Sequence, residues 1–428
     1  MKIHHFLFVL LLGPMTAMAQ SPDGSVYDSQ TVGEDTYTLT CDWLKQSVFD
    51  SYPGDFYRTD FFIYDGILYF NHAGADGEHY LYRVNASDGE YLGRVDIDWG
   101  EVPHGVNAST FVGQDEEGTP FVSSFAQHGN VNYPYTITML DIVDGMPVAV
   151  KTYELTNIAG WWLYETTVSG SLKTGNFRAV AAVKVYGDNR MPNPWGYAEW
   201  VFDGSSTYPA TCAKMTVSKG VAKPVAGGNV VVYDCDDNLI NKADYDCKSP
   251  TLCRFHDDET FDVIDTFDKN CLENTNGTGL DFAEYDGKHF MLYGAGFAPT
   301  RYGVACLKDF PESLKADVLW TLAASESFSS YPDTKEELFR HEFKNMTVHA
   351  DKQADDGLQF YVYTNQAGLA KYTIKKKSVI QTGIEDVGAE NCEAEFFSLS
   401  GLRLATAPTQ PGCYIKRSQG SVEKIMIR

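Results

Sequence analysis

The feature that most constrains this chain is a four-strand pattern that recurs along it. Within residues 60–97, the turn dipeptides Asp65-Gly66 and Asp88-Gly89 separate runs of apolar and alternating residues, and a longer polar stretch, residues 73–79, divides the two halves. An Asp-Gly pair between two such runs is a strong signal for a tight hairpin. The segment is therefore predicted to form a four-stranded antiparallel meander.

Five further copies of this unit are predicted. The weakest is residues 229–267, in which Cys235–Asn238 would form the first turn. The other copies span residues 109–155, 167–217, 280–322 and 346–384. Repeated four-stranded units are typical of a β-propeller, so we predict an all-β propeller of about six blades, with seven as the alternative count. A pair of β-sandwiches or a stack of sheets is the structural alternative.

The segment Ser25–Trp43 also has a strand-like pattern. Pairing with the last blade would close the ring and remove a free sheet edge, which isolated sheets otherwise expose. Aromatic residues make up 14% of the chain, and there are 37 glycines. Both values suit a chain of many strands and turns.

The net charge of −24 argues against the function classes that need a basic surface. Nucleic-acid binding and docking on anionic lipid both depend on clustered Lys and Arg. The nine cysteines are an odd number, so at least one is unpaired. Cys247 with Cys253, and Cys392 with Cys413, are plausible pairs by position alone.

The first nineteen residues have the order of a cleavable signal peptide. A basic start at Lys2 is followed by the apolar run Phe6–Leu12 and by Ala17-Met18-Ala19, whose small residues suit a signal peptidase. The apolar run is too short to span a bilayer, and we expect no transmembrane segment after residue 20. A buried N-terminal strand is the alternative. We therefore assign residues 1–19 to a signal peptide and residues 20–382 to the propeller.

The last 46 residues, 383–428, differ in character and are predicted to form a small three-stranded β module. They contain an aromatic-x-Leu-x-Gly-x-Arg run at Phe397–Arg403, a Pro-Gly-Cys-Tyr-Ile hairpin at Pro411–Ile415, and a Gly-x-x-x-Lys step at Gly420–Lys424 before a short apolar-basic end. This pattern resembles the C-terminal sorting domain of the type IX secretion system of Bacteroidota. The spacing of Pro408 and Pro411 departs from the family pattern, as does Cys413 beside the Tyr. The resemblance implies export across the outer membrane by that machinery and does not bear on activity.

The expected connections differ in length between the two ends of the strands. In a four-stranded blade, the first and third connections lie on one face, and the second connection and the link to the next blade lie on the other. The first kind is short here and the second is long, and long loops on a rigid scaffold commonly carry function. We therefore expect the binding residues on this long-connection face. The candidates are Trp99, His128, Tyr133, Trp161, Trp162, Arg190, Trp195, Arg301 and Tyr302.

These candidates favour recognition of a glycan or a protein, because Trp and Tyr rings combine a large apolar face with a polar edge. The alternative for each Trp is packing between blades. Asp234, Asp236 and Asp237 gather oxygen donors that suit Ca²⁺. They lack the glycine and distal glutamate of an EF-hand loop, so a solvated turn is the simpler interpretation and we expect no cofactor.

No catalytic motif is visible in the sequence. A nucleophile elbow, a phosphate-binding glycine loop and a Cys-x-x-Cys pair are all missing from it. The carboxylates Asp98, Glu165 and Glu199 are candidates for an acid/base pair acting on a glycan, but spacing alone does not set their separation. The catalytic residues, if any, stay unknown.

Together these features predict a secreted or surface-exposed, non-enzymatic binding or adhesion module that recognises a glycan or a protein partner. A glycan-active hydrolase or lyase on the same scaffold is the first alternative. It requires converging carboxylates, or a His–Tyr–Arg group, in a pocket at the propeller axis. A structural surface component without a ligand pocket is the second alternative.

Overall fold

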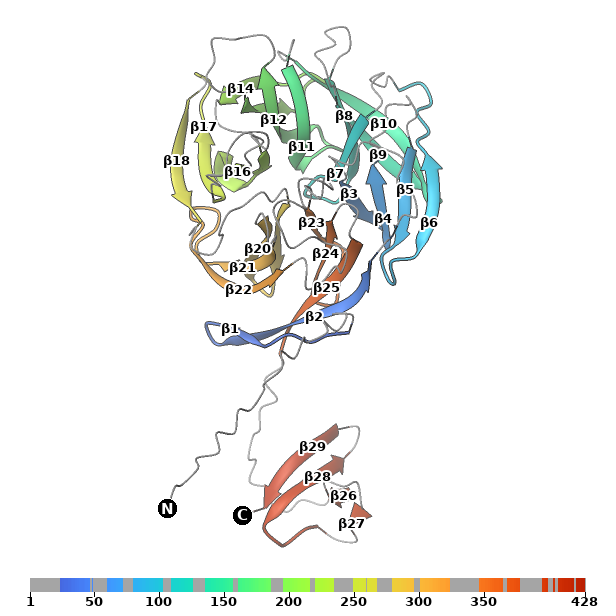
Figure 1. The fold of residues 1–428 in the computed structure, drawn as a ribbon, viewed down its shortest axis with the longest axis vertical. Coiled ribbons are helices and arrows are strands. Elements are labelled where there is room, and N and C mark those ends of the chain that lie inside the picture. The colour runs from blue at the N-terminus through green and yellow to red at the C-terminus, as the bar shows by residue number, and fades with distance from the viewer. Residues whose placement is uncertain are drawn as a thin grey trace, which may run out of the picture. The chain divides into compact units, whose positions relative to one another are not determined.

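In the described part of the chain, the computed structural model contains seven β-sheets, six of which form a ring (Figure 1). The chain divides into two compact units, residues 1–377 and residues 378–428. The described residues contain no helix long and apolar enough to cross a membrane. The structure describes residues 24–46, 48, 60–71, 80–102, 109–125, 135–156, 161–185, 195–215, 220–234, 249–258, 260–267, 279–295, 301–323, 346–364, 368–377, 395–398, 403–404, 407–418 and 421–427.

The ring is a six-bladed β-propeller in which each blade is an antiparallel meander. The first strand of each blade lies innermost, and consecutive innermost strands contact one another around the axis. Blade 1 is β3 (Phe61–Tyr64), β4 (Ile67–Asn71), β5 (Tyr80–Asn85) and β6 (Tyr91–Asp96); blade 2 is β7 (Ser109–Gln114), β8 (Pro120–Phe125), β9 (Tyr135–Val143) and β10 (Met146–Leu155); blade 3 is β11 (Trp161–Ser171), β12 (Asn176–Val185), β13 (Trp195–Asp203) and β14 (Thr211–Met215).

Blades 4 and 5 continue this order along the chain. One short 3-10 helix, η2 (Ala226–Gly228), forms the first turn of blade 4. Blade 4 is β15 (Gly220–Pro224), β16 (Asn229–Asp234), β17 (Thr251–Phe255) and β18 (Phe261–Thr266); blade 5 is β19 (Leu280–Tyr285), β20 (Lys288–Ala295), β21 (Arg301–Leu307) and β22 (Ala316–Ala323).

The ring is closed by the N-terminal segment, as the sequence predicts. Blade 6 takes three strands from the end of the unit, and β2 pairs antiparallel with the third of them, with Tyr37 opposite Lys376. The short strand β1 then pairs with β2 and extends this blade to five strands. The strands are β1 (Gln30–Val32), β2 (Asp35–Lys45), β23 (Met346–Ala350), β24 (Leu358–Thr364) and β25 (Gly368–Lys376).

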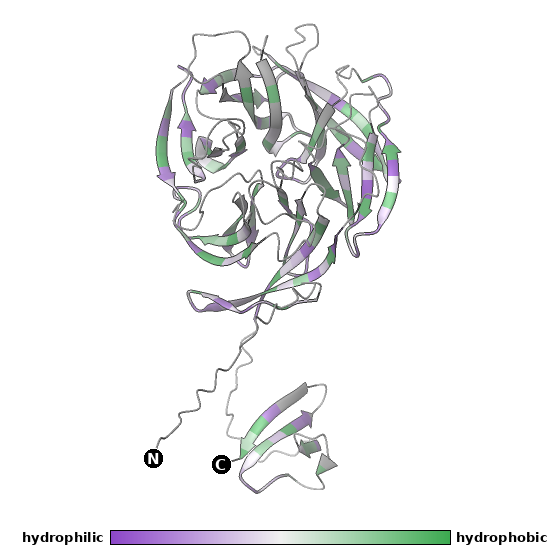
Figure 2. Cartoon of the chain, in the orientation of Figure 1, coloured by the Kyte–Doolittle hydropathy of each residue, from purple (hydrophilic) through white to green (hydrophobic). Residues whose placement is uncertain are grey.

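Six hydrophobic clusters hold the ring together, one at each junction between neighbouring blades. At the closing junction, Trp43 of β2 packs with Phe61 of β3 and Tyr361 of β24. Figure 2 shows the apolar residues concentrated along the strands of the blades. Large aromatic rings fill the widening space between twisted sheets, which explains the aromatic content.

Three of the tight turns have the backbone that their Asp-Gly sequences require. Asp65 and Gly66, Asp144 and Gly145, and Asp286 and Gly287 all have positive φ, between 48° and 77°. A two-residue hairpin of type I′ needs positive φ at both central positions, and its twist matches that of the flanking strands. These dipeptides therefore fix the register of blades 1, 2 and 5.

Two predictions about the repeats need correction. Blade 4 begins at Gly220, before the predicted start at Asn229, so its first turn is Val225–Gly228, and Cys235–Asn238 belongs to its second connection. Blade 3 begins at Trp161, before the predicted start at Thr167.

Neither pairing of cysteines forms, because Cys253 and Cys413 are both free thiols. Burial raises the pKa of the Cys253 thiol to about 11.

The second unit is described by itself. Its sheet has four strands in the order β27-β26-β28-β29, one more than predicted, because β27 pairs with β26 over two residues. The strands are β26 (Glu395–Ser398), β27 (Arg403–Leu404), β28 (Gly412–Ser418) and β29 (Ser421–Ile427). Residues 1–19, the predicted signal peptide, lie outside the described residues.

Candidate functional site

A small cavity lies on the propeller axis. Its wall takes side chains from the innermost strand of every blade, and its volume is about 60 Å³. Pockets that bind drug-sized ligands measure roughly 300 to 1,000 Å³. The axial cavity therefore has room for a few water molecules or a small ion, and not for a sugar ring. The polar residues in its wall are Asp60, Gln114, Thr166, Thr167, Lys223, Asp281, His349 and Lys352.

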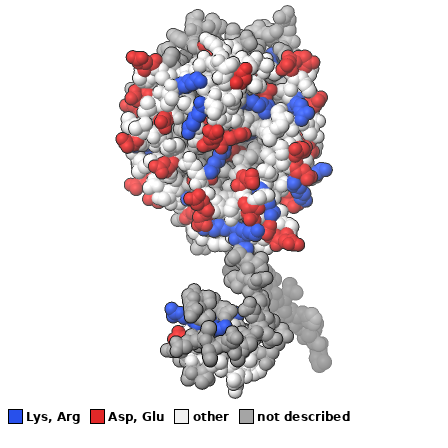
Figure 3. Space-filling model, turned by 180° about the vertical axis from the view of Figure 1, so that it is seen from behind, with Lys and Arg blue, Asp and Glu red and all other residues white. Residues whose placement is uncertain are grey.

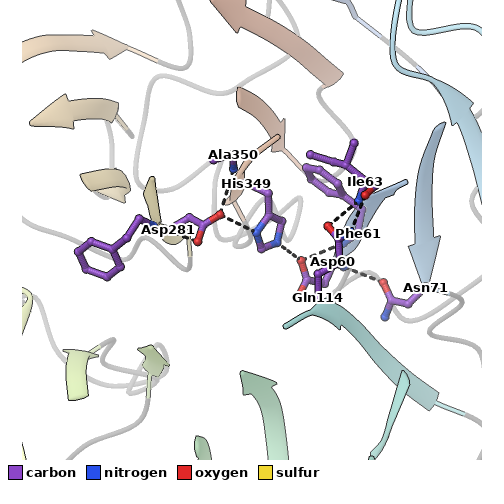
Figure 4. A network of polar contacts seen from close by, with 9 residues as sticks. Asp60, Phe61, Ile63, Asn71, Gln114, Asp281, His349 and Ala350 are labelled. Atoms are coloured by element: carbon purple, nitrogen blue, oxygen red, sulfur yellow. Dashed lines mark hydrogen bonds and ion pairs between the residues drawn. The ribbon is translucent and has the colours of Figure 1, made fainter. Parts of the chain in front are cut away.

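His349 of β23 links two carboxylates across this cavity (Figure 4). Its Nε2 atom lies 2.6 Å from Oδ1 of Asp60, just before β3, and its Nδ1 atom lies 3.5 Å from Oδ2 of Asp281 in β19. The three side chains are 14%, 7% and 11% exposed. One imidazole therefore joins blades 1, 5 and 6 at the axis.

Backbone amides hold both carboxylates in place. Oδ1 of Asp60 accepts a hydrogen bond from the amide of Phe61 at 2.8 Å, and Oδ1 of Asp281 accepts one from the amide of Phe282 at 2.9 Å. The amide of Ala350 also donates to Oδ2 of Asp281, at 3.0 Å. The first two bonds tie each acid to its own innermost strand, and the third ties Asp281 to β23. All three satisfy groups whose burial without partners is costly.

The network fixes the charges of its members. Burial alone lowers the pKa of His349, but the negative charge of Asp60 and the hydrogen bonds that the imidazole donates to both carboxylates outweigh this and raise the pKa to about 9. Burial raises the pKa of Asp281, but the charge of Lys223 and the hydrogen bond with His349 hold it well below its usual range. At neutral pH, His349 is a cation between two carboxylates.

The short turns of adjacent blades meet one another on the same face of the ring, which we call the tight-turn face. Asp115, in the first turn of blade 2, accepts a hydrogen bond at 2.9 Å from the amide of Leu172 in the first turn of blade 3. The first turn of blade 6, residues 351–357, reaches the same place: Lys352 Nζ lies 3.5 Å from the carbonyl oxygen of Asp115. Blade 6 thus contacts blade 2 across the axis.

The other ends of the strands carry the long connections. Within blades, residues 72–79, 126–134, 186–194 and 235–248 are long, whereas residues 296–300 and 365–367 are short, and segments such as residues 324–345 lie between blades. All these ranges lie outside the described residues, and so do His128, Tyr133, Arg190, Asp236 and Asp237.

Five predicted binding residues lie in strands and not in loops. The backbones of Trp161 and Trp162 belong to β11, that of Trp195 to β13, and those of Arg301 and Tyr302 to β21. Trp and Tyr favour pleated strands. The aromatic residues that we expected in loops therefore lie in the strands next to those loops. The structure describes only the backbone of Trp161, Trp162, Trp195 and Arg301, as it does for Asp234 at the end of β16.

Tyr302 and Trp99 belong to packing regions. Tyr302 is 1% exposed, and its hydroxyl is hydrogen-bonded to that of Tyr372 between blades 5 and 6. Tyr302 is therefore not on a binding surface, because its ring is enclosed in the core. Trp99 is partly buried against the cluster between blades 1 and 2.

Two of the three predicted acid/base carboxylates, Asp98 and Glu199, belong to different blades and do not converge, and the side chain of Glu165 lies outside the described residues. Glu199, in the third strand of blade 3, forms an ion pair with Arg178 of the same blade. Asp98 follows β6, where its carboxylate accepts a hydrogen bond at 3.0 Å from the amide of Gly100. Among the described residues, no group of three or more His, Cys, Asp or Glu side chains has the arrangement of a metal site.

Sequence reasoning missed Asp60, Asp281 and His349. Asp60-Phe61 and Asp281-Phe282 occupy the same position in two copies of the repeat, at the start of the innermost strand, and each Asp accepts a bond from the following amide. Alignment of the copies would have revealed this pair.

The charges on the face drawn in Figure 3 are mixed, with Lys and Arg interspersed among Asp and Glu.

Comparison with known proteins finds no matching family model and no matching curated protein. Solved structures of similar architecture include an ulvan lyase of polysaccharide lyase family PL25, with 10% identity, a TM-score of 0.38, and coverage of 81% of this chain and 90% of that one. The endo-arabinase from Bacteroides thetaiotaomicron matches with 11% identity, a TM-score of 0.37, and coverage of 78% and 99%. The GH43_1 enzyme from Xanthomonas citri matches with 12% identity, a TM-score of 0.34, and coverage of 77% and 89%. Such low values say nothing about the substrate or the functional residues of this chain.

Proposed function

We propose that this chain is a secreted or surface-exposed binding module that recognises a glycan or a protein partner through the long-connection face of the propeller. The observation that supports this proposal is the small size of the axial cavity and the pairing of the charged side chains in it. There, His349 is engaged by Asp60 and Asp281 in a cavity of about 60 Å³, which has no room for a sugar beside them. Recognition is then left to the long connections, which carry His128, Tyr133 and Arg190.

The route to the surface is part of the same proposal. The signal-peptide pattern of residues 1–19 supports export, and the resemblance of residues 383–428 to a type IX sorting domain supports passage across the outer membrane by that secretion machinery. A secreted chain with a net charge of −24 also gains solubility from its charge.

A glycan-active hydrolase or lyase is the second candidate. One specific observation favours it: two carboxylates, Asp60 and Asp281, converge on one histidine at the propeller axis. Paired carboxylates are the acid and base groups of most glycoside hydrolases. This candidate requires the cavity to open in the presence of substrate.

A glycan array and a turnover screen on the chain from Gln20 onward test both candidates. The double variant Tyr133→Ala/Arg190→Ala removes two side chains from the long connections. Tyr208→Ala is the matched control, because Tyr208 is 52% exposed and lies between β13 and β14, on the tight-turn face.

We expect binding without product, lost in the double variant and kept in Tyr208→Ala. Product formation that disappears in Asp60→Asn would contradict the binding proposal and support a glycan-active enzyme. No binding and no product with any glycan would remove the glycan from the proposal and leave a protein partner or a purely structural role.

A further inference from the structure

The outermost strand of blade 4, β18, has an open side. It is the last strand in the order of its sheet and lies on the outer rim of the ring (Figure 1). Among the described residues, the backbone of β18 forms a ladder with β17 alone. Blade 5 contacts β18 at Asp265, whose Oδ2 atom accepts bonds from the Ser313 hydroxyl and the Leu314 amide. The N–H and C=O groups that point away from β17 can therefore pair with another strand.

The outer edges of three other blades are partly covered by segments of the chain itself. The backbone of Asp98 bonds to Pro147 and Ala149 along β10 of blade 2. Residues 24–28 run along β2 of blade 6 in the same way, and β1 continues this cover. The indole of Trp320, in β22 of blade 5, donates to a carbonyl of the same segment at 2.9 Å. These edges are therefore less accessible to a partner strand.

Apolar side chains of β18 are exposed beside its open edge. Val263 is 57% exposed and Ile264 is 39% exposed, and Ile264 has no residue opposite it in β17. The strand contains no lysine or arginine, whereas β6 and β14, the outer strands of blades 1 and 3, contain Arg94 and Lys214. Charged residues, lysine above all, are a common means by which natural sheet edges avoid pairing with other chains. β18 lacks this protection against a basic partner.

The charges of β18 and of the turn before it are all acidic. Asp257 and Asp258 are exposed in that turn, and Asp262 and Asp265 lie on either side of the two apolar residues. The side chain of Asp262 is 73% exposed. Four aspartates thus lie within nine residues along the edge.

The neighbouring cations do not neutralise this edge. Arg254 lies opposite Asp262 in β17, and Lys315 follows the residues of blade 5 that bond Asp265. His256 lies 3.1 Å from a carboxylate oxygen of Asp262. Even with His256 protonated, these three cations face four carboxylates, so the edge keeps a negative excess.

A second copy of β18 is disfavoured as the partner strand. In antiparallel pairing centred on Val263 and Ile264, Asp262 of each copy would lie opposite Asp265 of the other. Like charges directly opposite one another destabilise a sheet, whereas lysine or arginine at those positions would stabilise it. The net charge of −24 also favours the approach of a basic partner over that of a second copy.

We propose that β18 is a strand-addition site for an extended, basic segment of a partner protein, in which apolar residues alternate with lysine or arginine. The added strand extends the sheet of blade 4 through backbone hydrogen bonds, as in other cases of strand addition. Its apolar residues cover Val263 and Ile264, and its cations pair with Asp262 and the acidic turn. The site is separate from the long-connection face and does not depend on the function proposed for that face.

Fluorescence anisotropy tests this site on the chain from Gln20 onward. The probe is a labelled peptide in which lysine and valine alternate over six residues, the length of β18. One control peptide has glutamate in place of lysine. A second control has methylated backbone nitrogens, which keeps the charges but removes the backbone donors. We expect binding of the first peptide only.

The double variant Asp262→Lys/Val263→Lys is expected to weaken this binding by about tenfold. The matched control is Leu92→Lys/Asp96→Lys, which makes the same change in charge on the edge strand β6, where Leu92 is 39% and the side chain of Asp96 is 72% exposed. It is expected to leave the affinity close to that of wild type. Ile264→Lys serves as a second variant if the first does not fold, as judged by circular dichroism.

Three results would overturn the proposal. The first is no binding of the lysine-valine peptide by wild type. The second is equal binding of the methylated peptide, or equal loss in the two double variants, since either would mean attraction by charge alone. The third is a wild-type dimer in sedimentation that Val263→Lys dissolves, which would identify a second copy as the partner of β18.

Discussion

Two ionic clusters join blade 6 to its neighbours, and they differ mainly in burial. The axial cluster is His349 with Asp60 and Asp281, and its side chains are at most 14% exposed. The closure cluster lies between β2, β25 and blade 5, where Lys376 bridges Asp35 at 2.7 Å and Asp286 at 2.8 Å, with side chains 25% to 36% exposed. Lys288 pairs with Asp35, and Tyr37 donates to Asp286 at 2.9 Å, in the same cluster.

Ion pairs of similar geometry therefore contribute differently to the stability of the fold. Exposed ion pairs are screened by water and salt and contribute little, whereas breaking a buried pair leaves an uncompensated charge in a poor solvent. The axial cluster is therefore expected to determine stability. The closure cluster is expected mainly to fix the register of β2 on β25.

The largest effect is expected at His349. His349→Leu removes the cation that bonds both buried carboxylates, and we expect it to lower the free energy of unfolding by about 3 to 5 kcal/mol. Urea unfolding at pH 7 measures this change. The control is His256→Leu, because His256 is 40% exposed and the side chain of Asp262, with which it pairs, is 73% exposed. A similar loss of unfolding free energy in the two variants would contradict the larger contribution expected of the axial cluster.

The next effect is the pH dependence of the axial cluster. The pKa of His349 rises from 6.5 to about 9 on folding, because burial is outweighed by Asp60 and Asp281. Its contribution is therefore complete below about pH 6.5 and is lost as the pH rises to about 9. The pKa of Asp281 is lowered, so its own contribution is lost as the pH falls below the ordinary range of an aspartate.

Unfolding free energies of wild type and His349→Leu, measured between pH 6 and pH 10, test this window. We expect the difference between the two proteins to shrink with rising pH. A constant difference across the window would mean that His349 is neutral in the folded protein and acts by packing alone.

A smaller effect is expected in the closure cluster. Lys376→Met removes both bridges of its ammonium group to Asp35 and Asp286, and we expect a shift in the urea midpoint well below that of His349→Leu. The shift should shrink further in molar sodium gluconate, because salt screens exposed charges. A shift that persists at high salt would indicate that this cluster is as well shielded as the axis.

The smallest effect is expected from removal of the C-terminal unit. The chain separates into two compact units at residues 377 and 378, each with its own sheets. A chain that ends at Lys377 is therefore expected to keep the thermal midpoint of the propeller, as calorimetry would report. A fall of several degrees would show that the second unit stabilises the propeller.

The sequence predicts the blades where it contains strong turn signals. Asp-Gly turns placed blades 1, 2 and 5 correctly, and the strand-like pattern near the N-terminus correctly indicated ring closure. Blade 4 was misplaced because its first strand, Gly220–Pro224, is short and ends in proline. Its first turn also lacks the Asp-Gly pair.

The axial cluster was not predictable from local pattern. Asp60 and His349 are 289 residues apart in sequence, and they meet only because the ring closes. Tyr302 was expected on a surface because aromatic residues near a turn suit either a loop or an interface between blades. The residue type alone does not distinguish these two environments.

The most direct test of the central claim, that recognition belongs to the long-connection face and not to the axis, is a binding measurement on two variants side by side. The ligand found in the array screen is titrated against Tyr133→Ala/Arg190→Ala and against Lys223→Met, each checked for folding by circular dichroism. Affinity is expected to fall at least tenfold in the first variant and to stay within twofold of wild type in the second. Loss of affinity in Lys223→Met, with affinity intact in the double variant, would contradict this claim and move the binding site to the propeller axis.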